Sequence, residues 1–414
     1  MDGRLPADMQ VELDGAGTAD LVVGFPTAGP SATAPALAAA IRSGLETHFS
    51  GHSAVVVHVD QVPSGETETQ IDEALGSVRL VRVRPSPAPG ARATAGQPEW
   101  DEAVQTILAM GRRLEARATV VLNPEVTSTT RPWSIGLGEP ILKEDYGLVL
   151  PVYQRSRYEG TLTHALVVPL IRALFGKRLG HPVAEEFGCS AAAADALLEQ
   201  DVWGTDLAHN GLEFWLPVAA IEGGLSLGQA ALGPRTVPAP GRPAPLGPTV
   251  GRVAGALFTL AERFDTTWLD VRGSQPVSMI GTSPEMLPGS TPVDPERMLH
   301  GFRQGVRDLY PIWERILAPD NLGEVLVLSQ TGPEEFRFPD PLWARVVYDF
   351  LLAHRARVLY RSHVAQSLAP LYLGRTASVF LETRTGPAAS VGEVAERLGH
   401  EFEEQKAYLV DRWQ

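Results

Sequence analysis

The chain has 414 residues, of which 44% are hydrophobic and 20% charged, and its formal net charge is −14. This length exceeds what one hydrophobic core usually serves, so two domains are expected. The acidic balance argues against nucleic acid as the general partner. The single cysteine, Cys189, excludes an internal disulfide framework, fits a reducing cytoplasm, and is expected to be a buried thiol. No apolar run resembles a signal peptide or approaches the roughly 18 residues of a membrane span.

Short apolar runs alternate with helical patterns in the first half of the chain. The patterns predict strands at residues 19–25, 54–59, 78–83, 120–122 and 146–153, and helices after Ser31 and around 99–115. Strands that alternate with helices indicate a mostly parallel α/β sheet, whose ligands bind at the carboxyl ends of the strands. The loops that follow these strands are therefore where a site is expected.

The second half is predominantly helical in pattern. Residues 234–248 are rich in Pro and Gly, as is typical of a linker between domains. Helical patterns follow at 250–268, 295–317, 342–359 and 390–413. The predicted organisation is an α/β domain over residues 1–237, a Pro/Gly-rich linker over 238–249, and a mainly α-helical domain over 250–414.

The sequence V-V-L-N-P-E at residues 120–125 combines a strand with polar side chains that could bind a metal. Many nucleotide-sugar transferases place a D-x-D metal clamp at the end of such a strand. Glu125 is a good ligand for Mg²⁺ or Mn²⁺, and Asn123 offers a neutral oxygen. The alternative is the ordinary turn that ends a strand.

Two other polar loops follow predicted strands. Asp60 precedes Q-V-P-S-G-E-T, where its carboxylate either accepts hydrogen bonds from a nucleobase or bonds to amides of the turn. The stretch Y-Q-R-S-R-Y-E-G-T-L-T combines Arg155, Gly160 and Thr163 before a predicted helix. Arginine side chains and free amides at a helix start suit a carboxylate or phosphate. The alternative is a solvated rim and a helix cap.

Acidic side chains recur in W-G-T-D-L-A-H-N-G-L-E-F-W, residues 203–215. A regular helix would place Asp206 and His209 on one face, with Glu213 one turn further on. That arrangement fits a metal or acid–base cluster, and it fits equally well the exposed face of an amphipathic helix.

From about Asp20 to Trp413 the chain resembles the glucosylglycerate and mannosylglycerate synthase group of glycosyltransferases. It is most similar to the long bacterial relatives that carry a C-terminal helical extension. The resemblance implies a GT-A fold, in which a mostly parallel nucleotide-binding sheet has helices on both faces. It also implies transfer of a hexose from a nucleotide sugar to glycerate or phosphoglycerate, with Mg²⁺ or Mn²⁺ and with retention of configuration.

The acceptor motifs of that family are well matched. Y-Q-R-S-R-Y-E-G-T-L-T keeps an arginine, here Arg155, and the family's G-x-x-T, here Gly160 and Thr163. H-P-V-A-E-E-F-G resembles the family's Q-P-x-G-G-acid-F-G, which implies that Glu186 is its acid. W-G-T-D-L-A-H-N-G-L-E resembles the segment that ends in a carboxylate beside the sugar, here Glu213. The resemblance therefore implies Glu186 and Glu213 as catalytic carboxylates.

The nucleoside motifs are partly matched. G-F-P-T-A-G-P resembles the family's first nucleotide loop, which implies that Pro26 and Thr27 contact the nucleotide. Asp60 falls where the family has its nucleobase-binding Asp. This correspondence favours the binding role for Asp60 over the turn.

The phosphate and metal motifs are degenerate. The family's Gly-Lys-Gly loop falls at residues 99–101, which are Glu-Trp-Asp, and its D-x-D falls at Asn123-Pro124-Glu125. Its metal-binding histidine is replaced by Val237, with Arg235 as a candidate source of charge. A pyrophosphate leaving group needs positive charge from a metal, Lys or Arg. The predicted metal site, Asn123 and Glu125, is therefore weakened.

Three functions remain open from the sequence. The first is a working hexosyltransferase that binds a nucleotide sugar and a small acidic acceptor. The second is a catalytically impaired relative that binds a small anion or a protein. The third is self-association through the helical half.

Overall fold

The computed structural model describes residues 17–84, 99–237, 245–282, 284, 286–287, 292–387 and 390–413. The chain divides into two compact units. Unit 1 comprises Met1–Gln154, Val183–Ala239 and Val277–Pro284, and unit 2 comprises Arg155–Pro182, Pro240–Pro276 and Glu285–Gln414. Most of the predicted Pro/Gly-rich linker, 238–249, lies outside the described residues.

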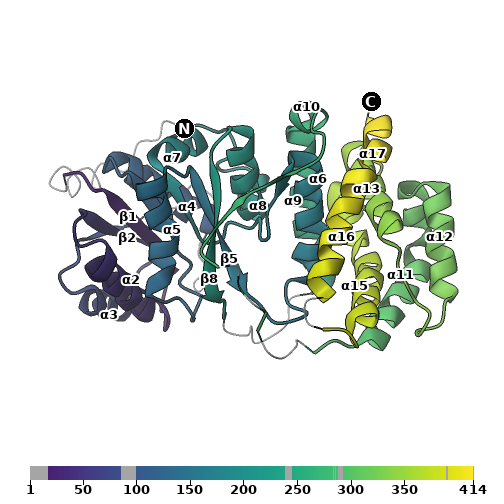
Figure 1. The fold of residues 1–414 in the computed structure, drawn as a ribbon, viewed down its shortest axis with the longest axis horizontal. Coiled ribbons are helices and arrows are strands. Elements are labelled where there is room, and N and C mark those ends of the chain that lie inside the picture. Colours follow the sequence, from purple (N-terminus) through teal and green to yellow (C-terminus); the bar gives the residue numbers. More distant parts are fainter. Residues whose placement is uncertain are drawn as a thin grey trace. The chain divides into compact units, whose positions relative to one another are not determined.

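Unit 1 is built on an eight-stranded sheet with the strand order β10-β8-β5-β7-β4-β1-β2-β3. Figure 1 labels four of these strands, β1, β2, β5 and β8. Its strands are β1 (Leu21–Ala28), β2 (Ala54–Val62), β3 (Leu80–Val83), β4 (Ala118–Val121), β5 (Leu148–Gln154), β7 (Phe187–Ser190), β8 (Leu227–Pro234) and β10 (Ser278–Ile280). Every neighbouring pair is parallel except the pairs that β7 makes with β4 and β5. The expected mostly parallel α/β sheet is confirmed.

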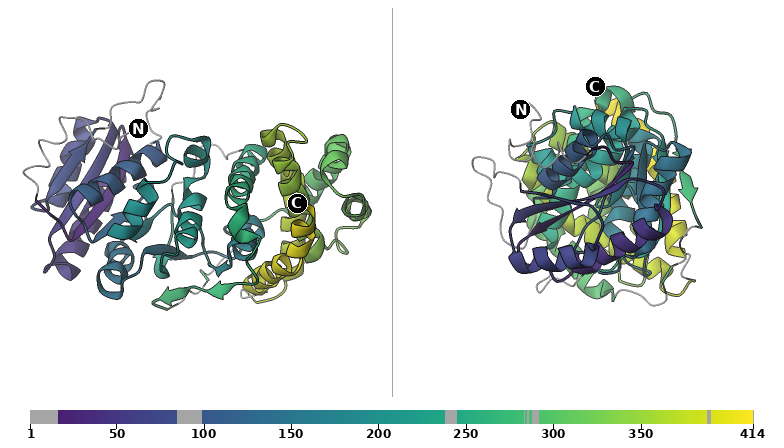
Figure 2. Two further views of the ribbon diagram at one scale, coloured as in Figure 1. Left: turned by 90° about the horizontal axis from the view of Figure 1, so that it is seen from above. Right: turned by 90° about the vertical axis from the view of Figure 1, so that its left-hand side faces the viewer.

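Helices cover both faces of this sheet (Figure 2). They are α2 (Ala34–His48), α3 (Gly65–Leu75), α4 (Trp100–Arg113), α5 (Arg131–Glu144), α7 (Ala191–Leu198) and α8 (Asp206–Glu222). Alternate residues of β1, namely Leu21, Val23 and Phe25, pack in one core with α2, α3 and α5. Gly24 faces the opposite side, where any side chain would collide with Ile107 of α4. Successive residues of a strand point to opposite faces of the sheet. The helices α2, α3 and α5 therefore cover one face, and α4 covers the other.

Two of the strands run further than the sequence patterns predict. β1 continues through Pro26 to Ala28, and β2 continues past Val59 to Val62. Beyond Gly24, β1 no longer pairs with β4 but still pairs with β2. Pro26 therefore lies where one side of the strand has no partner, which is a position that tolerates its missing N–H.

The antiparallel strand β7 carries the single cysteine. Cys189 is completely buried, and burial raises the pKa of its thiol to about 12. A thiol with so high a pKa is a poor nucleophile at neutral pH. The expected buried thiol is confirmed.

Unit 2 is mainly helical. Its elements are the π-helix η1 (Thr163–Val167), α6 (Val168–Phe175), α9 (Leu246–Arg263), α10 (Asp265–Trp268), α11 (Pro295–Ile316), α12 (Pro319–Gln330), α13 (Asp340–Arg355), α14 (Arg361–Ser367), α15 (Ala369–Thr383), α16 (Ser390–Glu404), α17 (Lys406–Trp413), and the short parallel pair β6 (Lys177–Arg178) and β9 (Gln275–Pro276). Residues 155–182 belong to this unit, and the indole of Trp343 donates to the Ala165 carbonyl at 2.8 Å. The expected helical C-terminal half is confirmed, and α9 starts inside the predicted linker.

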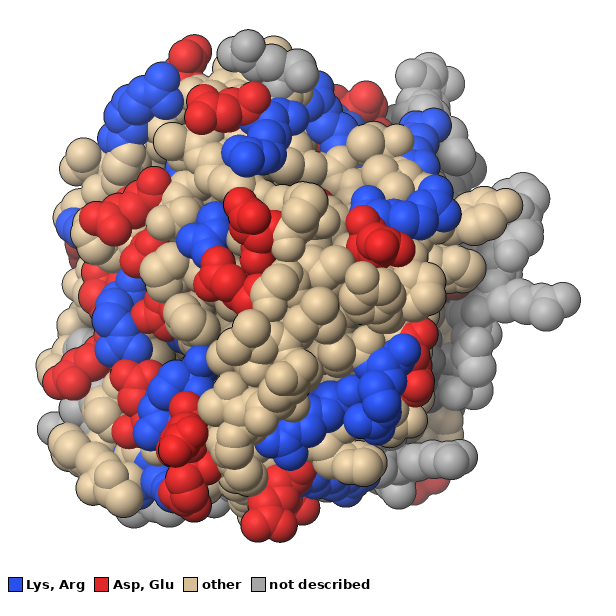
Figure 3. Space-filling model, turned by 90° about the vertical axis from the view of Figure 1, so that its right-hand side faces the viewer, with Lys and Arg blue, Asp and Glu red and all other residues tan. Residues whose placement is uncertain are grey.

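Charged side chains of both signs are interspersed over the face shown in Figure 3. Among the described residues, the two most exposed large apolar side chains both belong to unit 2: Val327, 68% exposed, and Tyr360, 80% exposed. Within the described ranges, no helix has the length and apolar character needed to cross a membrane. Self-association through the helical half stays a prediction.

Candidate functional site

The carboxyl edge of the sheet in unit 1 brings several predicted site residues together. The strands β1, β2, β4, β5 and β8 all end at this edge, and the antiparallel β7 begins there. Thr27 and Asp60 lie near the ends of β1 and β2, Asn123 follows β4, Arg235 follows β8, and Glu186 precedes β7. This edge is where ligands bind in open α/β sheets.

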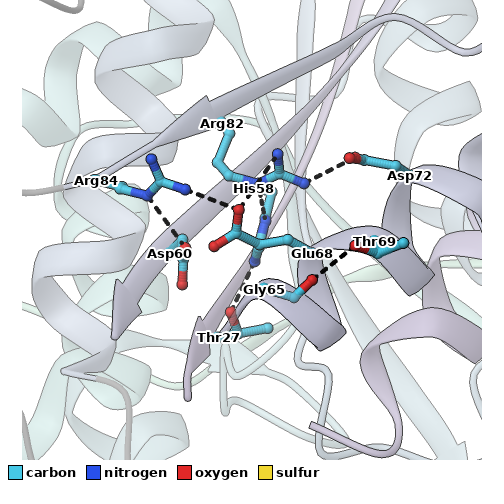
Figure 4. Close-up of polar contacts among 9 residues, drawn as sticks. All are labelled: Thr27, His58, Asp60, Gly65, Glu68, Thr69, Asp72, Arg82 and Arg84. Atoms are coloured by element: carbon cyan, nitrogen blue, oxygen red, sulfur yellow. Dashed lines mark hydrogen bonds and ion pairs between the residues drawn. The ribbon is translucent and has the colours of Figure 1, made fainter. Parts of the chain in front are cut away.

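Thr27 and Asp60 are direct neighbours across β1 and β2, so their side chains lie on the same face. Both are buried. Pro26, the other predicted nucleotide contact, precedes Thr27 in β1. His58, two residues before Asp60, shares that face, and its Nε2 lies 2.8 Å from Thr27 Oγ1 (Figure 4).

The hydrogen bonds of His58 determine its tautomer. Arg82 Nε donates to His58 Nδ1 at 3.2 Å, so Nδ1 carries no proton. Burial first, and then Arg82 and Arg84, lower the pKa of His58 to about 3. The neutral ring therefore holds its proton on Nε2 and donates it to Thr27. This leaves the Thr27 hydroxyl group as a donor to a further acceptor.

Asp60 lies within a small network of acidic and basic side chains (Figure 4). Arg84 Nε lies 3.4 Å from Asp60 Oδ2, and Arg84 Nη2 donates to Glu68 of α3 at 2.9 Å. Burial and the neighbouring Glu68 raise the pKa of Asp60, although Arg84 opposes them. Sequence patterns missed Glu68, because they treat residues 61–67 as a turn-rich loop, whereas α3 starts at Gly65.

Residues 99–101, which the resemblance aligns with a phosphate loop, lie at the start of α4. Trp100 is the first helical residue, Glu99 precedes it, and Asp101 and Glu102 occupy the first turn. Burial, then Glu99 and Asp101, raise the pKa of Glu102. Acidic side chains already occupy the positive end of this helix dipole. This segment therefore provides no positive field for a pyrophosphate.

Asn123 forms a turn with Glu125. The Asn123 Oδ1 atom accepts a hydrogen bond from the Glu125 backbone N–H at 2.9 Å, and the Glu125 side chain is exposed. Val237, which the resemblance aligns with a metal-binding histidine, can offer no metal ligand. Across the described part of the chain, no group of three or more His, Cys, Asp or Glu side chains is placed to hold a metal. These residues do not fit a resident divalent cation.

A second polar cluster lies at the ends of β5 and β8. Glu186 is fully buried and accepts a hydrogen bond from the Tyr153 hydroxyl. Arg235 Nη2 lies 3.5 Å from Glu186 Oε1, forms an ion pair with Glu185, and places its guanidinium 5.6 Å from the centre of the Tyr153 ring. The sequence suggested Arg235 as a source of charge, but it did not indicate its pairing with two carboxylates.

The cluster holds one group that titrates near neutrality and one permanent charge. Burial raises the pKa of Glu186 to about 7, with a contribution from Glu185, while Arg235 and Tyr153 act in the opposite direction. Burial disfavours the charged form of Arg235, but the two carboxylates keep its pKa above the usual value. Glu186 can therefore exchange a proton near pH 7 while Arg235 stays charged.

The predicted common face does not extend from Asp206 and His209 to Glu213. The helix α8 has a non-helical residue, Gly211, between His209 and Glu213, and this break disrupts the 3.6-residue period. Glu213 instead comes close to the start of β7 through its backbone, because its carbonyl accepts a hydrogen bond from Ala184 N–H at 2.8 Å. The two predicted catalytic carboxylates, Glu186 and Glu213, thus come from neighbouring segments.

The predicted acceptor residues belong to unit 2. Gly160 has φ of +71°, a conformation that favours glycine, and a side chain there would collide with Arg155. Arg155 Nη2 also lies 3.2 Å from each ring nitrogen of His181. Thr163 begins the π-helix η1. The structure thus brings Arg155 and Gly160 together immediately before a helix start.

No family model matches the chain, and no curated protein matches it. Similar solved structures include glucosyl-3-phosphoglycerate synthase from Mycobacterium tuberculosis with Mn²⁺, UDP and glucosyl-3-phosphoglycerate, at 20% identity over 64% of this chain and 85% of that chain, with a TM-score of 0.42. The same enzyme with Mn²⁺, UDP-glucose and phosphoglyceric acid is 20% identical over 69% and 95% of the chains, with a TM-score of 0.39. A mycobacterial protein is 21% identical over 64% and 80%, with a TM-score of 0.42.

Proposed function

We propose that the chain is a glycosyltransferase that moves a hexose from a nucleotide sugar to a small acidic acceptor such as glycerate or phosphoglycerate. The observation that carries this proposal is the arrangement of Thr27, His58 and Asp60 at the carboxyl ends of β1 and β2. A buried carboxylate can accept a nucleobase N–H, and a hydroxyl held as a donor can bind the adjacent carbonyl. The pair is therefore complementary to a base that carries N–H beside C=O.

The other roles follow from the placement of charge. Glu186 and Glu213 would lie beside the transferred sugar, with Glu186 able to hold or release a proton near pH 7. Arg235 would offset negative charge that develops on the leaving group. Pro26 would contact the nucleotide, and Arg155, Gly160 and Thr163 would hold the acid group of the acceptor.

Divalent metal chemistry would supply a Lewis acid for the diphosphate of the leaving nucleotide. Asn123 and Glu125 offer only one free carboxylate and one engaged amide oxygen. The proposed binding of the nucleotide therefore rests on residues of the chain itself, above all on Asp60 and Arg235.

Calorimetry with UDP and GDP tests the nucleoside site. Asp60→Asn should weaken binding roughly 10- to 100-fold, because a hydrogen bond to a charged group contributes about 1.5–3 kcal/mol. Asp72→Asn is the matched control, since Asp72 also forms an ion pair with an arginine, Arg82, but is exposed. If neither nucleotide binds the unaltered chain, with or without Mn²⁺, the transferase proposal fails.

The same titration tests whether a divalent metal contributes to nucleotide binding. Affinity should be equal in EDTA and in Mn²⁺, because the described residues do not form a divalent site. A rise of tenfold or more in Mn²⁺ that disappears in Glu125→Ala would show that Glu125 holds an ion after all.

A second candidate is a relative that binds the nucleotide without turnover. The observation in its favour is the acidic first turn of α4, where the phosphates would lie. Incubation with UDP-glucose and 3-phosphoglycerate distinguishes the two functions. A glycosylated product that Glu186→Gln abolishes supports the transferase, whereas tight binding with no product supports the impaired relative.

A further inference from the structure

The guanidinium of Arg235 has two carboxylates as neighbours, and they differ in their access to solvent. Arg235 follows β8 at the carboxyl edge of the sheet, and its Nη2 atom forms ion pairs with Glu185 and Glu186. The side chain of Glu186 is 1% exposed, whereas that of Glu185 is 40% exposed and that of Arg235 is 17% exposed. Solvent therefore reaches the pair that Arg235 makes with Glu185.

The two carboxylates exceed the charge of the one guanidinium. The pKa of Glu186 is about 7, so Glu186 adds a second negative charge as the pH rises above neutrality. An exposed ion pair contributes little to stability, because water solvates both charges well. The pair of Arg235 with Glu185 can therefore be broken with a small loss of free energy.

The backbone beside Arg235 is fixed without any contribution from Glu185. The next residue, Thr236, donates its N–H to Ser128 Oγ at 2.8 Å. Its carbonyl accepts a hydrogen bond from the Thr127 N–H at 2.9 Å. Both backbone groups of Thr236 are thus bonded to the loop that follows β4.

The side chain of Arg235 is also held from its buried side. Its guanidinium lies 5.6 Å from the centre of the Tyr153 ring, and Tyr153 packs against Trp133 with ring centres 5.2 Å apart. The Tyr153 hydroxyl donates to Glu186, whose other oxygen, Oε1, lies 3.5 Å from Arg235. Tyr153 and Glu186 therefore orient the guanidinium, and Glu185 is not needed for that purpose.

Glu185 thus lies where an anionic ligand of Arg235 would bind. We propose that Glu185 is a displaceable counter-ion, which the diphosphate of the nucleotide replaces on Arg235. The carboxylate moves into solvent, and the diphosphate brings more negative charge to the guanidinium than one carboxylate does. A ligand without phosphate gains nothing from this exchange, so Glu185 makes the site selective for diphosphates.

Calorimetric titration of the full chain with inorganic pyrophosphate tests the exchange without a nucleobase. Glu185→Gln should bind pyrophosphate roughly three- to tenfold more tightly than the wild type, because the exposed carboxylate no longer competes for Arg235. Glu139→Gln is the matched control, since Glu139 is 37% exposed and pairs with Lys143. Its affinity should equal that of the wild type. Equal affinity of Glu185→Gln and the wild type, or no binding by either, overturns the proposal.

A double variant tests whether the gain arises at Arg235. Glu185→Gln/Arg235→Gln is measured at pH 6, where Glu186 with its pKa of about 7 is mostly protonated and tolerates the loss of its cation. Circular dichroism checks that the variant is folded. It should bind pyrophosphate no more tightly than the wild type at the same pH. If it keeps the gain, pyrophosphate binds elsewhere and the proposal is overturned.

The identity of the natural ligand rests on the proposed function, whereas the exchange at Arg235 is tested independently by pyrophosphate. Glu185→Gln should tighten UDP binding by the same factor and leave the affinity for uridine, which has no phosphate, unchanged. Tighter pyrophosphate binding without any UDP binding would support the role of Glu185 and reject the transferase. UDP binding that Glu185→Gln does not change would leave the transferase standing and overturn the role of Glu185.

Discussion

Three buried ionisable side chains at the carboxyl edge of the sheet, His58, Asp60 and Glu186, differ in the charged neighbours that set their pKa values. His58 is neutral, because burial and two arginines oppose its charge and its ring nitrogens bond to Arg82 and Thr27. Asp60 has neighbours of both signs, Arg84 and Glu68. Glu186 has one cation, Arg235, and titrates near neutrality. Each arrangement depends on which side chains the fold brings to the same place.

Glu186 should make the stability of the protein depend on pH. Its pKa is about 7 in the folded chain and near 4.5 when unperturbed, so the folded state binds this proton more tightly. The stability that this proton contributes is complete below about pH 4.5 and is lost as the pH rises towards 7. From pH 5 to pH 8, wild-type protein should lose roughly 1–3 kcal/mol more unfolding free energy than Glu186→Gln.

Urea unfolding of both proteins at the two pH values measures this difference. Glu125→Gln serves as the control, because Glu125 is an exposed carboxylate at the same edge and its replacement should leave the pH dependence of the wild type unchanged. Parallel losses in wild type and Glu186→Gln would mean that Glu186 is ionised in the folded state at pH 5.

At the scale of elements, β7 is the feature that the patterns did not anticipate. It is inserted antiparallel between β4 and β5, and it places Glu186 at the carboxyl edge. It packs beneath α5, where Gly188 faces the backbone of Leu137. The close approach of strand and helix requires a residue without a side chain.

Gly188→Ala should therefore be destabilising. The new methyl group would collide with the Leu137 carbonyl, and overpacking of this kind costs roughly 1–3 kcal/mol. Gly233→Ala, in β8, has no atom within 4 Å of the added methyl group and should change stability by less than about 1 kcal/mol. Chemical denaturation of both variants measures the contrast, and equal stabilities would contradict the tight packing of α5 on β7.

At the scale of the molecule, the two compact units are not continuous in sequence. Residues 155–182 follow β5 along the chain but pack with the helical unit, where α6 contacts α16 and Trp343 bonds to Ala165. The domain boundaries predicted from the sequence, 1–237 and 250–414, do not coincide with the two units, because residues 155–182 lie within 1–237 but belong to unit 2.

A fragment of residues 1–239 should consequently leave η1 and α6 without their packing partners. Leu166, Leu170 and Leu174 are buried in the full chain and would be exposed in the fragment. Amide hydrogen exchange in residues 163–175 should be roughly 100-fold faster, or more, in the fragment. Protection equal to that of the full chain would show that these helices need nothing beyond residue 239.

Local sequence by itself determined most of the sheet and most of the long helices. Apolar period and strand-breaking residues are local signals, so the strands near 21, 54, 80, 118 and 148 and the helices near 100, 295, 340 and 390 were all predicted. The helices α3, α5, α12 and α15 were missed. Gly65 in α3 and Pro140 in α5 weaken the local helical signal. The motifs also located the loops that follow the strands.

Only the tertiary structure decided how the side chains in those loops are used. The sequence left Asn123 open between a metal ligand and a turn, and the folded chain turns its amide oxygen to the Glu125 N–H. The ion pair of Glu186 with Arg235 and the tautomer of His58 depend on partners at least 24 residues away along the chain. Burial and pairing of charge are properties of contacts between distant segments, and no local pattern encodes them.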